Sequence, residues 1–183
     1  MSIAEAVLTV DEYYDLPDDG RRTELVRGRI IPMPPPDFLH GYVSLEIGSV
    51  LRAWIKERNL GRAVSNDSGI LTQHDPDTLR AADVAYYSFA RLPKETTPKK
   101  YPDVPPDLVI EVKSPSDRWR EIHTKVAEYL NLGVPVVCVL DPDTLTARLY
   151  YPDLPDQILG PDDELTFPEC LPGFAVLIRS LFE

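Results

Sequence analysis

The sequence predicts an α/β fold in which a mixed β-sheet is flanked by helices. Hydrophobic residues make up 43% of the 183 residues, a share that is typical of a globular chain with one sizeable core. Residues 107–113, 116–132 and 134–140 follow one another as predicted strand, helix and strand, the order of a parallel crossover connection. We therefore expect one domain that spans residues 1–183.

The N-terminal third is predicted to contain a short helix, an extended segment and a long helix. The helix is expected at DEYYDL (11–16), and TELVRGRIIPM (23–33) is typical of extended chain with a turn in its middle. The prolines of PMPPPDF (32–38) interrupt that pattern, because proline has no N–H to donate to a sheet. From about 41 to 58 apolar residues recur at spacings of three and four, which predicts an amphipathic helix.

The middle of the chain is predicted to be mostly extended. RAVSNDSGILTQ (62–73) indicates a strand or a hairpin, and ADVAYYSFA (82–90) a strand, since both are rich in residues that favour β-structure. Residues 91–106 form a loop rich in proline and lysine, and the strand at 107–113 follows it.

The C-terminal part begins with the crossover helix. Ser116 or Asp117 is expected to cap it, and Gly133 to end it. The unbroken apolar run VPVVCVL (134–140) predicts a buried strand, which the turn DPDTL joins to an antiparallel partner, TARLYY (146–151). The C-terminal segment LPGFAVLIRSLF (171–182) predicts one more strand and a short helical end.

The strand at 107–113 combines an apolar face with a charged one. Because side chains alternate along a strand, its even positions, Leu108, Ile110 and Val112, share the apolar face. The other face carries Asp107, Val109, Glu111 and Lys113. At normal strand rise the Cβ atoms of Glu111 and Lys113 lie roughly 6.5–7 Å apart, so both side chains are expected to reach one small ligand.

A carboxylate and a lysine on one face point to a divalent-ion site for hydrolysis. Mg²⁺ prefers carboxylate oxygens, usually one or two, and an ion-bound water loses its proton more readily. Asp83, at the start of the preceding strand, is the best candidate for a second carboxylate; Asp107 and Asp103 are poorer ones. The sequence therefore predicts that Asp83 and Glu111 bind Mg²⁺ or Mn²⁺ and that Lys113 acts beside them. It contains no HxH, HExxH or cysteine cluster typical of zinc, and no Walker or GxSxG motif.

An acidic residue at a strand start, followed by Glu-x-Lys in the next strand, resembles the PD-(D/E)xK nuclease superfamily. More closely, the chain is similar to that superfamily's Uma2 family. The resemblance rests on ELVRGRI with Glu24, His40, RAADVAYY with Asp83, PDLVIEVKSPSDR, Lys125 with Tyr129, and GVPVVCVLDP. It implies a restriction-endonuclease-like sheet with a helix–strand–strand–strand–helix–strand core and an N-terminal β extension. It also implies a metal-dependent DNA endonuclease.

The resemblance adds three candidate site residues. In family members that lack the strand lysine, a lysine from the following helix substitutes for it, and Lys125 matches that position. Glu24 is implied as a third acidic member, and Glu46 on the first core helix competes for that role. The family's frequent proline before the first aspartate is replaced here by Ala82.

Each candidate also has a plain structural interpretation. Glu111 and Lys113 would be an ion pair on a wet sheet face, and Asp83 a strand-end aspartate. Lys125 would pair with Glu121 one helical turn away, and Glu24 with a nearby arginine of its own hairpin.

Composition limits the partners and the location. The net charge of −11 argues against extensive binding of nucleic acid, since phosphate contacts need a basic surface. The positively charged residues that contact DNA would come from RLPKETTPKK (91–100), Arg118 and Arg120. An inactive nuclease-like fold that binds a protein or a nucleic acid is therefore the alternative function.

The remaining expectations concern assembly and location. A homodimer is expected because cutting both strands of a duplex needs two sites. A cytoplasmic protein is predicted because the two cysteines form no CxxC and no basic leader precedes an apolar stretch. The chain is not expected to enter a membrane, because it has no apolar run of about 20 residues.

Overall fold

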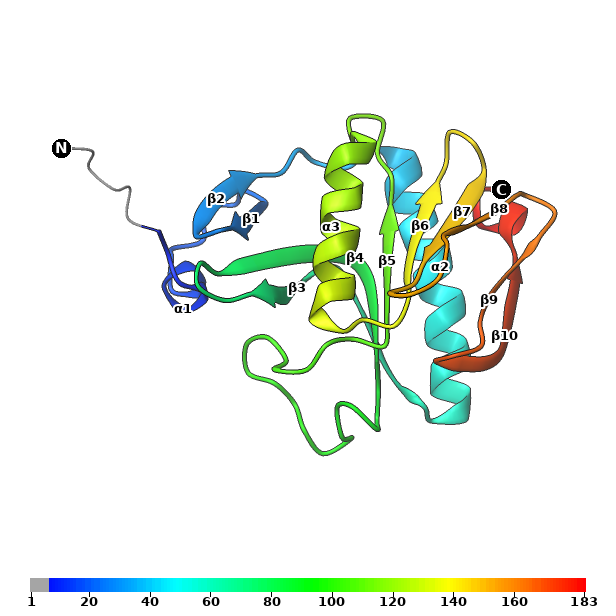
Figure 1. Ribbon diagram of the computed structural model, residues 1–183, viewed down its shortest axis with the longest axis horizontal. Helices are drawn as coiled ribbons and strands as arrows, with labels where there is room; N and C mark the ends of the chain where they lie inside the picture. Colours follow the sequence, from blue (N-terminus) through cyan, green and yellow to red (C-terminus); the bar gives the residue numbers. More distant parts are fainter. Residues whose placement is uncertain (1–6) are drawn as a thin grey trace.

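The computed structural model describes residues 7–183, apart from the side chain of Asp67 (Figure 1). Its helices are α1 (Val10–Tyr14), α2 (Phe38–Arg58), α3 (Trp119–Leu132) and the 3-10 helix η1 (Ile178–Leu181). Its strands are β1 (Thr23–Val26), β2 (Arg29–Pro32), β3 (Gly61–Gln73), β4 (Thr78–Ser88), β5 (Leu108–Val112), β6 (Val137–Asp141), β7 (Thr146–Tyr150), β8 (Gln157–Leu159), β9 (Glu164–Phe167) and β10 (Leu171–Leu177).

Eight strands form one mixed sheet in the order β2-β1-β4-β5-β6-β7-β8, with β3 also paired to β4. The neighbours β5 and β6 are parallel, and α3 connects them as the predicted crossover helix. The other pairs are antiparallel. The succession α2-β3-β4-β5-α3-β6 is the predicted core, and β1 with β2 is the predicted N-terminal extension, so the α/β prediction is confirmed.

The two long helices cover opposite faces of the sheet, α3 in front and α2 behind in Figure 1. Leu108, Ile110 and Val112 of β5 pack in one apolar cluster with α2. Val109 packs in a second cluster with Ile122, Val126 and Tyr129 of α3. The alternation predicted for β5 is therefore confirmed, and it directs Glu111, two residues after Val109, toward α3.

The ends of the helices differ from the prediction in two places. Helix α2 begins at Phe38, about three residues early, because the Asp37 side chain caps it by accepting a hydrogen bond from the His40 N–H at 2.8 Å. Helix α3 has Arg118 at its N-cap position, without a side-chain cap. The predicted cap at Ser116 or Asp117 is wrong, because the Asp117 carboxylate instead accepts from the Ser114 N–H at 2.8 Å.

The hairpin of β1 and β2 is tied to the sheet at several points. Leu25 of β1 pairs with Leu79 of β4, and the Gly28 N–H donates to the Asp77 carbonyl at 2.7 Å. Gly28 has a φ of +73°, and a Cβ there would lie 2.5 Å from the Val7 Cβ, so the turn requires glycine. This hairpin is therefore a fixed extension of the sheet. Among residues 7–183 no helix has the length and apolarity needed to cross a bilayer.

Candidate active site

Asp83 lies where β4 and β5 separate, one residue before the last paired position, Val84 with Ile110. Its Oδ2 accepts a hydrogen bond from the Val112 N–H at 2.7 Å, and its Oδ1 lies 3.2 Å from His40 Nε2. The Asp83 side chain is 10% exposed. Because β4 and β5 separate here, the Val112 N–H is free to bind the Asp83 carboxylate, which lines a cavity.

His40 comes from the first turn of α2 and is buried. Burial acts to lower its pKa, but the hydrogen bond and charge of Asp83 outweigh burial and raise the pKa of His40 above 6.5. His40 Nδ1 is buried without a hydrogen-bond partner among the described residues. This histidine therefore adds a proton-binding group directly beside the Asp83 carboxylate.

Glu111 of β5 lies on the α3 side and is 8% exposed. Its Oε1 accepts a hydrogen bond from the Tyr129 hydroxyl at 2.7 Å, and its Oε2 lies 3.8 Å from Lys125 Nζ. Burial raises the pKa of Glu111 to about 7; Lys125 opposes that shift and the Asp83 charge adds to it. Burial therefore outweighs the nearby Lys125 ammonium at the Glu111 carboxylate.

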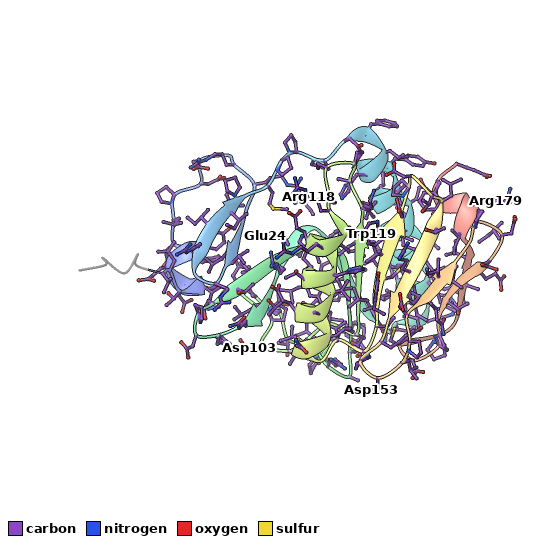
Figure 2. All side chains as sticks on the ribbon, turned by 45° about the horizontal axis from the view of Figure 1, so that its top comes forward. Glu24, Asp103, Arg118, Trp119, Asp153 and Arg179 are labelled. Carbon is purple, nitrogen blue, oxygen red and sulfur yellow. The ribbon has the colours of Figure 1, made fainter. Side chains whose placement is uncertain are left out.

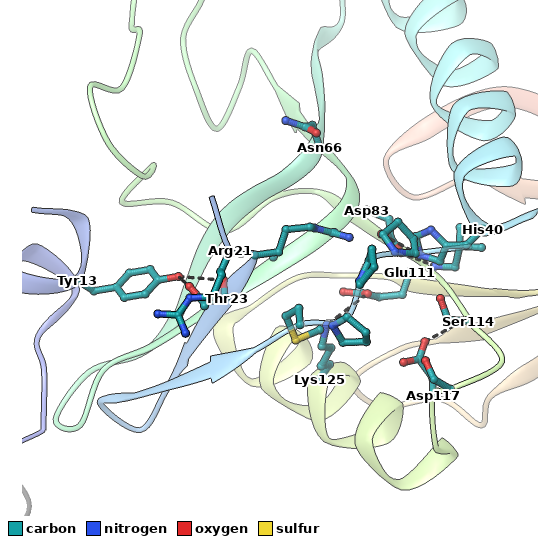
Figure 3. A pocket seen from close by; sticks show the side chains of 18 of the residues that line it. Tyr13, Arg21, Thr23, His40, Asn66, Asp83, Glu111, Ser114, Asp117 and Lys125 are labelled. Carbon is teal, nitrogen blue, oxygen red and sulfur yellow. Dashed lines mark hydrogen bonds and ion pairs between the residues drawn. The ribbon is translucent and has the colours of Figure 1, made fainter. Parts of the chain in front are cut away.

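Lys125 of α3 supplies the lysine of this cluster. Its Nζ lies 2.8 Å from Glu24 Oε1, and its side chain is 17% exposed. Burial disfavours the charged form, but Glu111 and Glu24 more than offset it and raise the pKa of Lys125. The residue therefore remains an ammonium ion between the carboxylates of Glu24 and Glu111. Figure 3 shows Lys125 and Glu111 in the larger cavity.

Glu24 of β1 is the third acidic residue of the cluster, and it is 2% exposed. Besides Lys125, its carboxylate accepts from Arg80 Nη1 at 2.8 Å and from the Ala81 N–H at 3.1 Å. Arg80 is itself held by Glu128 of α3, at 2.5 and 2.8 Å. This network fastens the hairpin to β4 and α3. Burial acts to raise the pKa of Glu24, but Lys125 and Arg80 outweigh it and hold the pKa below 4.5.

We expect Glu24→Ala to lower the free energy of unfolding at pH 7 by about 3 kcal/mol, since it leaves buried cations without their partner. The depressed pKa of Glu24 means that its stabilisation is present above pH 4.5 and lost as the pH falls below that value. The variant should therefore lose less stability than the wild type between pH 5 and pH 3. Urea unfolding over this pH range measures both effects, and Glu164→Ala at an exposed position is the control. The same free energy of unfolding at each pH for the wild type and Glu24→Ala would contradict the expectation.

Lys113 is paired with two aspartates that are not part of the Asp83–Glu111 pair. Its Nζ lies 2.7 Å from Asp143 Oδ2 and 3.6 Å from Asp141 Oδ1, both at the β6–β7 turn. Strand β5 ends at Val112, so the alternation that predicted convergence of Glu111 and Lys113 does not extend to Lys113. Lys113 and Lys125 both line the smaller cavity with Glu111, and Lys125 is the one whose Nζ lies close to the Glu111 carboxylate, at 3.8 Å.

The other predicted acids lie apart from the cluster. Asp107 pairs with Arg91 Nε at 3.0 Å and accepts from the Ser88 N–H. Asp103 lies toward the end of α3 that is opposite Arg118 and Trp119 (Figure 2). Glu46 lines neither of the two cavities beside the cluster, so Glu24 is the acid that joins it.

Two cavities adjoin at this cluster. The larger, of about 640 Å³, is lined by residues of several elements, including Tyr13, Arg21, Pro34–Pro36, His40, Asn66, Asp83, Tyr101 and Ser114. The smaller, of about 300 Å³, is lined by residues that include Glu24, Val26, Ile31, Arg80, Lys113 and Ile122. Both are lined by Met33, Glu111, Val112, Asp117 and Lys125. In Figure 3, Tyr13 and Asn66 lie away from Asp83 and Glu111 within the larger cavity.

The donor set fits Mg²⁺ or Mn²⁺. Among residues 7–183, no three His, Cys, Asp or Glu side chains come together as a ready-made metal site. Mg²⁺, however, is usually bound through one or two carboxylates and keeps several waters. Asp83 and Glu111 supply two carboxylates that line one cavity.

Arg80, Glu128 and the pairing role of Tyr129 were not recognised from the sequence. Tyr129 lies on the apolar stripe of α3, where its ring is part of the core and only its hydroxyl reaches Glu111. Arg80 and Glu128 are 48 residues apart, and no local pattern links them. His40 was singled out only through the family resemblance.

The fold and the cluster define a restriction-endonuclease-like α/β protein with an acidic site beside a lysine. A model of the Uma2 family, described as "Putative restriction endonuclease", matches residues 10–179. The chain therefore belongs to the Uma2 family.

One solved structure shows the same fold. It is described as a putative nuclease belonging to DUF820 from Anabaena variabilis, and it aligns with a TM-score of 0.83 and 24% identity. The alignment covers 96% of this chain and 97% of that one. A comparison with curated proteins finds no match.

Proposed function

We propose that this protein is a Mg²⁺- or Mn²⁺-dependent endonuclease that hydrolyses phosphodiester bonds of DNA. The observation that carries the proposal is the arrangement of Asp83, Glu111 and Lys125 around one cavity. The family description "Putative restriction endonuclease" and the description of the solved relative as a "putative nuclease" support the same reaction.

Each residue of the cluster has a distinct role in this proposal. Asp83 and Glu111 hold the ion, which supplies Lewis-acid stabilisation of the phosphate when it is bound. Lys125 remains charged and either orients the attacking water or stabilises negative charge on the phosphate in the transition state. Tyr129 and Glu24 are positioning residues, because the first fixes Glu111 and the second fixes Lys125.

The net charge of −11 favours a second candidate, a binding module without catalysis. Part of the expected basic surface is also neutralised, since Lys100 pairs with Asp11 at 2.7 Å. Such a module needs no ion at Asp83 and Glu111. The homodimer and the cytoplasmic location are further predictions, and size measurement in solution tests the first.

Two measurements test the proposed function. Single-stranded, duplex and branched DNA should be cut in Mg²⁺ or Mn²⁺ and left intact in EDTA. Titration calorimetry should give a Mn²⁺ binding heat that Asp83→Asn weakens by at least about tenfold, while Asp153→Asn, an exposed control, leaves it unchanged. A protein that cuts no DNA and shows no Mn²⁺ heat dependent on Asp83 would be the binding module.

A further inference from the structure

Glu111 and Lys125 lie at the junction of two cavities, with a fixed wall of the hairpin beside them. Met33, just after the hairpin, lines both cavities together with these two residues. The Glu24 ion pairs hold the hairpin to β4 and α3, at 2.8 Å on each side. A substrate that reaches Glu111 must therefore enter a space whose wall does not move away without breaking buried ion pairs.

The dimensions of this space favour a single strand. A cavity of about 640 Å³ lies within the range of roughly 300–1,000 Å³ that encloses a small-molecule ligand, which corresponds to one or two nucleotides. Duplex DNA is stiff over roughly 150 base pairs and does not fold into such a cavity. A net charge of −11 opposes contact with any phosphate backbone, and it opposes a duplex more because a duplex carries about twice the charge per unit length of one of its strands.

The larger cavity carries aromatic rings away from the carboxylates. Tyr13 is held by its hydroxyl, which donates to the Thr23 carbonyl at 2.9 Å. The Tyr101 ring lies against β3 at Gly69, where a Cβ would be 2.5 Å from its Cε1. Aromatic side chains that stack on bases, beside a positively charged groove, are the usual means of binding unpaired strands. Arg21 and Lys125 line this cavity with the two tyrosines.

The smaller cavity has an apolar side on which a base would fit. Val26, Ile31 and Met33 from the hairpin region line it together with Ile122 of α3. Ile31 lies opposite Glu24 in the register of the hairpin, so both side chains are on the face toward the cluster. Unpaired bases are held between apolar or aromatic side chains in enzymes that act on extruded nucleotides.

From these observations we propose, on the basis of the proposed nuclease function, that the substrate is unpaired DNA. A single strand enters past Tyr13 and Tyr101, its scissile phosphate lies at Glu111 and Lys125, and the base of a neighbouring nucleotide occupies the smaller cavity between Ile31 and Ile122. Paired DNA is cut only where it is frayed or unpaired.

The first test compares one labelled strand in three contexts with Mn²⁺: alone, in a blunt duplex, and in a duplex with unpaired arms. We expect cleavage in unpaired segments to be at least about tenfold faster than inside the duplex, the size of one lost base contact. If cleavage inside the duplex were as fast as cleavage in unpaired segments, the inference would be overturned, while the nuclease function would stand.

If no DNA is cut, the proposed function fails, and binding then decides the inference. Fluorescence anisotropy in EDTA, with the same three DNAs, should show the single strand bound at least about tenfold more tightly than the duplex. No binding, or equal binding of both forms, would overturn the inference.

The second test uses a matched pair of variants. Ile30 and Ile31 are both 41% exposed on β2, but they lie on opposite faces of the hairpin. Ile31→Trp fills the smaller cavity and should lower cleavage or binding of the single strand by at least about tenfold, while Ile30→Trp should change it by less than about twofold. An equal effect of the two variants, or none from Ile31→Trp, would contradict the base position.

Discussion

Replacing Glu111 with glutamine is expected to reduce DNA cleavage by at least about a hundredfold, because the ion loses one of its two carboxylates. The Tyr129 hydroxyl still has an oxygen to which it donates, so the fold should remain intact. The rate of cleavage of a labelled single strand in Mn²⁺ measures the effect, and thermal unfolding of the same sample checks the fold.

The control for this variant is Glu164→Gln, which removes a carboxylate from the exposed first position of β9, far along the chain. It should cleave at the wild-type rate. A folded Glu111→Gln protein that keeps more than about a tenth of the wild-type rate would remove Glu111 from the proposed catalytic residues.

The second prediction with a large expected effect on the cleavage rate distinguishes Lys125 from Lys113. Lys125→Met should lower the cleavage rate by about a hundredfold, since its ammonium group is the one that lies near Glu111. Lys113→Met should retain the rate to within about threefold, because its Nζ is paired with Asp143 and Asp141. Parallel single-turnover assays of the two proteins make the comparison.

Lys125→Met also removes the cation near Glu111 and leaves Glu24 with Arg80 alone, so instability by itself could lower its activity. Lys125→Arg keeps the positive charge; it should restore stability and recover only part of the rate, because a guanidinium differs from an ammonium in shape and donor geometry. If Lys113→Met is the inactive variant and Lys125→Met is active, the lysine of the Glu-x-Lys motif is the catalytic one.

The elements of this protein follow from local patterns in the chain. Spacings of three and four predicted α2, alternation predicted β5, and an unbroken apolar run predicted β6, because these periods reflect which face of a helix or strand is buried. The same alternation placed Val109 and Glu111 on one face of β5, and the structure has both toward α3. The predictions were wrong at some element ends. At the start of α3, for example, the Asp117 carboxylate accepts a hydrogen bond from the Ser114 N–H instead of capping the helix.

The cluster depends on contacts that no local pattern contains. Alternation predicted Lys113 beside Glu111, but β5 ends at Val112, and two aspartates of the β6–β7 turn pair with the lysine. Glu24 reaches Lys125 only because the hairpin pairs with β4, roughly 55 residues further along the chain. Such pairings join segments that are distant in the sequence, so spacing carries no signal for them.

The α/β class and the order of the core elements could be predicted from the chain alone, since burial patterns are local properties. Asp83 and Glu111 were predicted as the ion-binding carboxylates from their residue types and positions, and that assignment stays a prediction. The tertiary structure alone decided which lysine accompanies them, how Glu24 fixes that lysine, and that the pair opens onto two adjoining cavities. The physical reason is that ion pairing and desolvation depend on distance in space, and only the folded chain sets those distances.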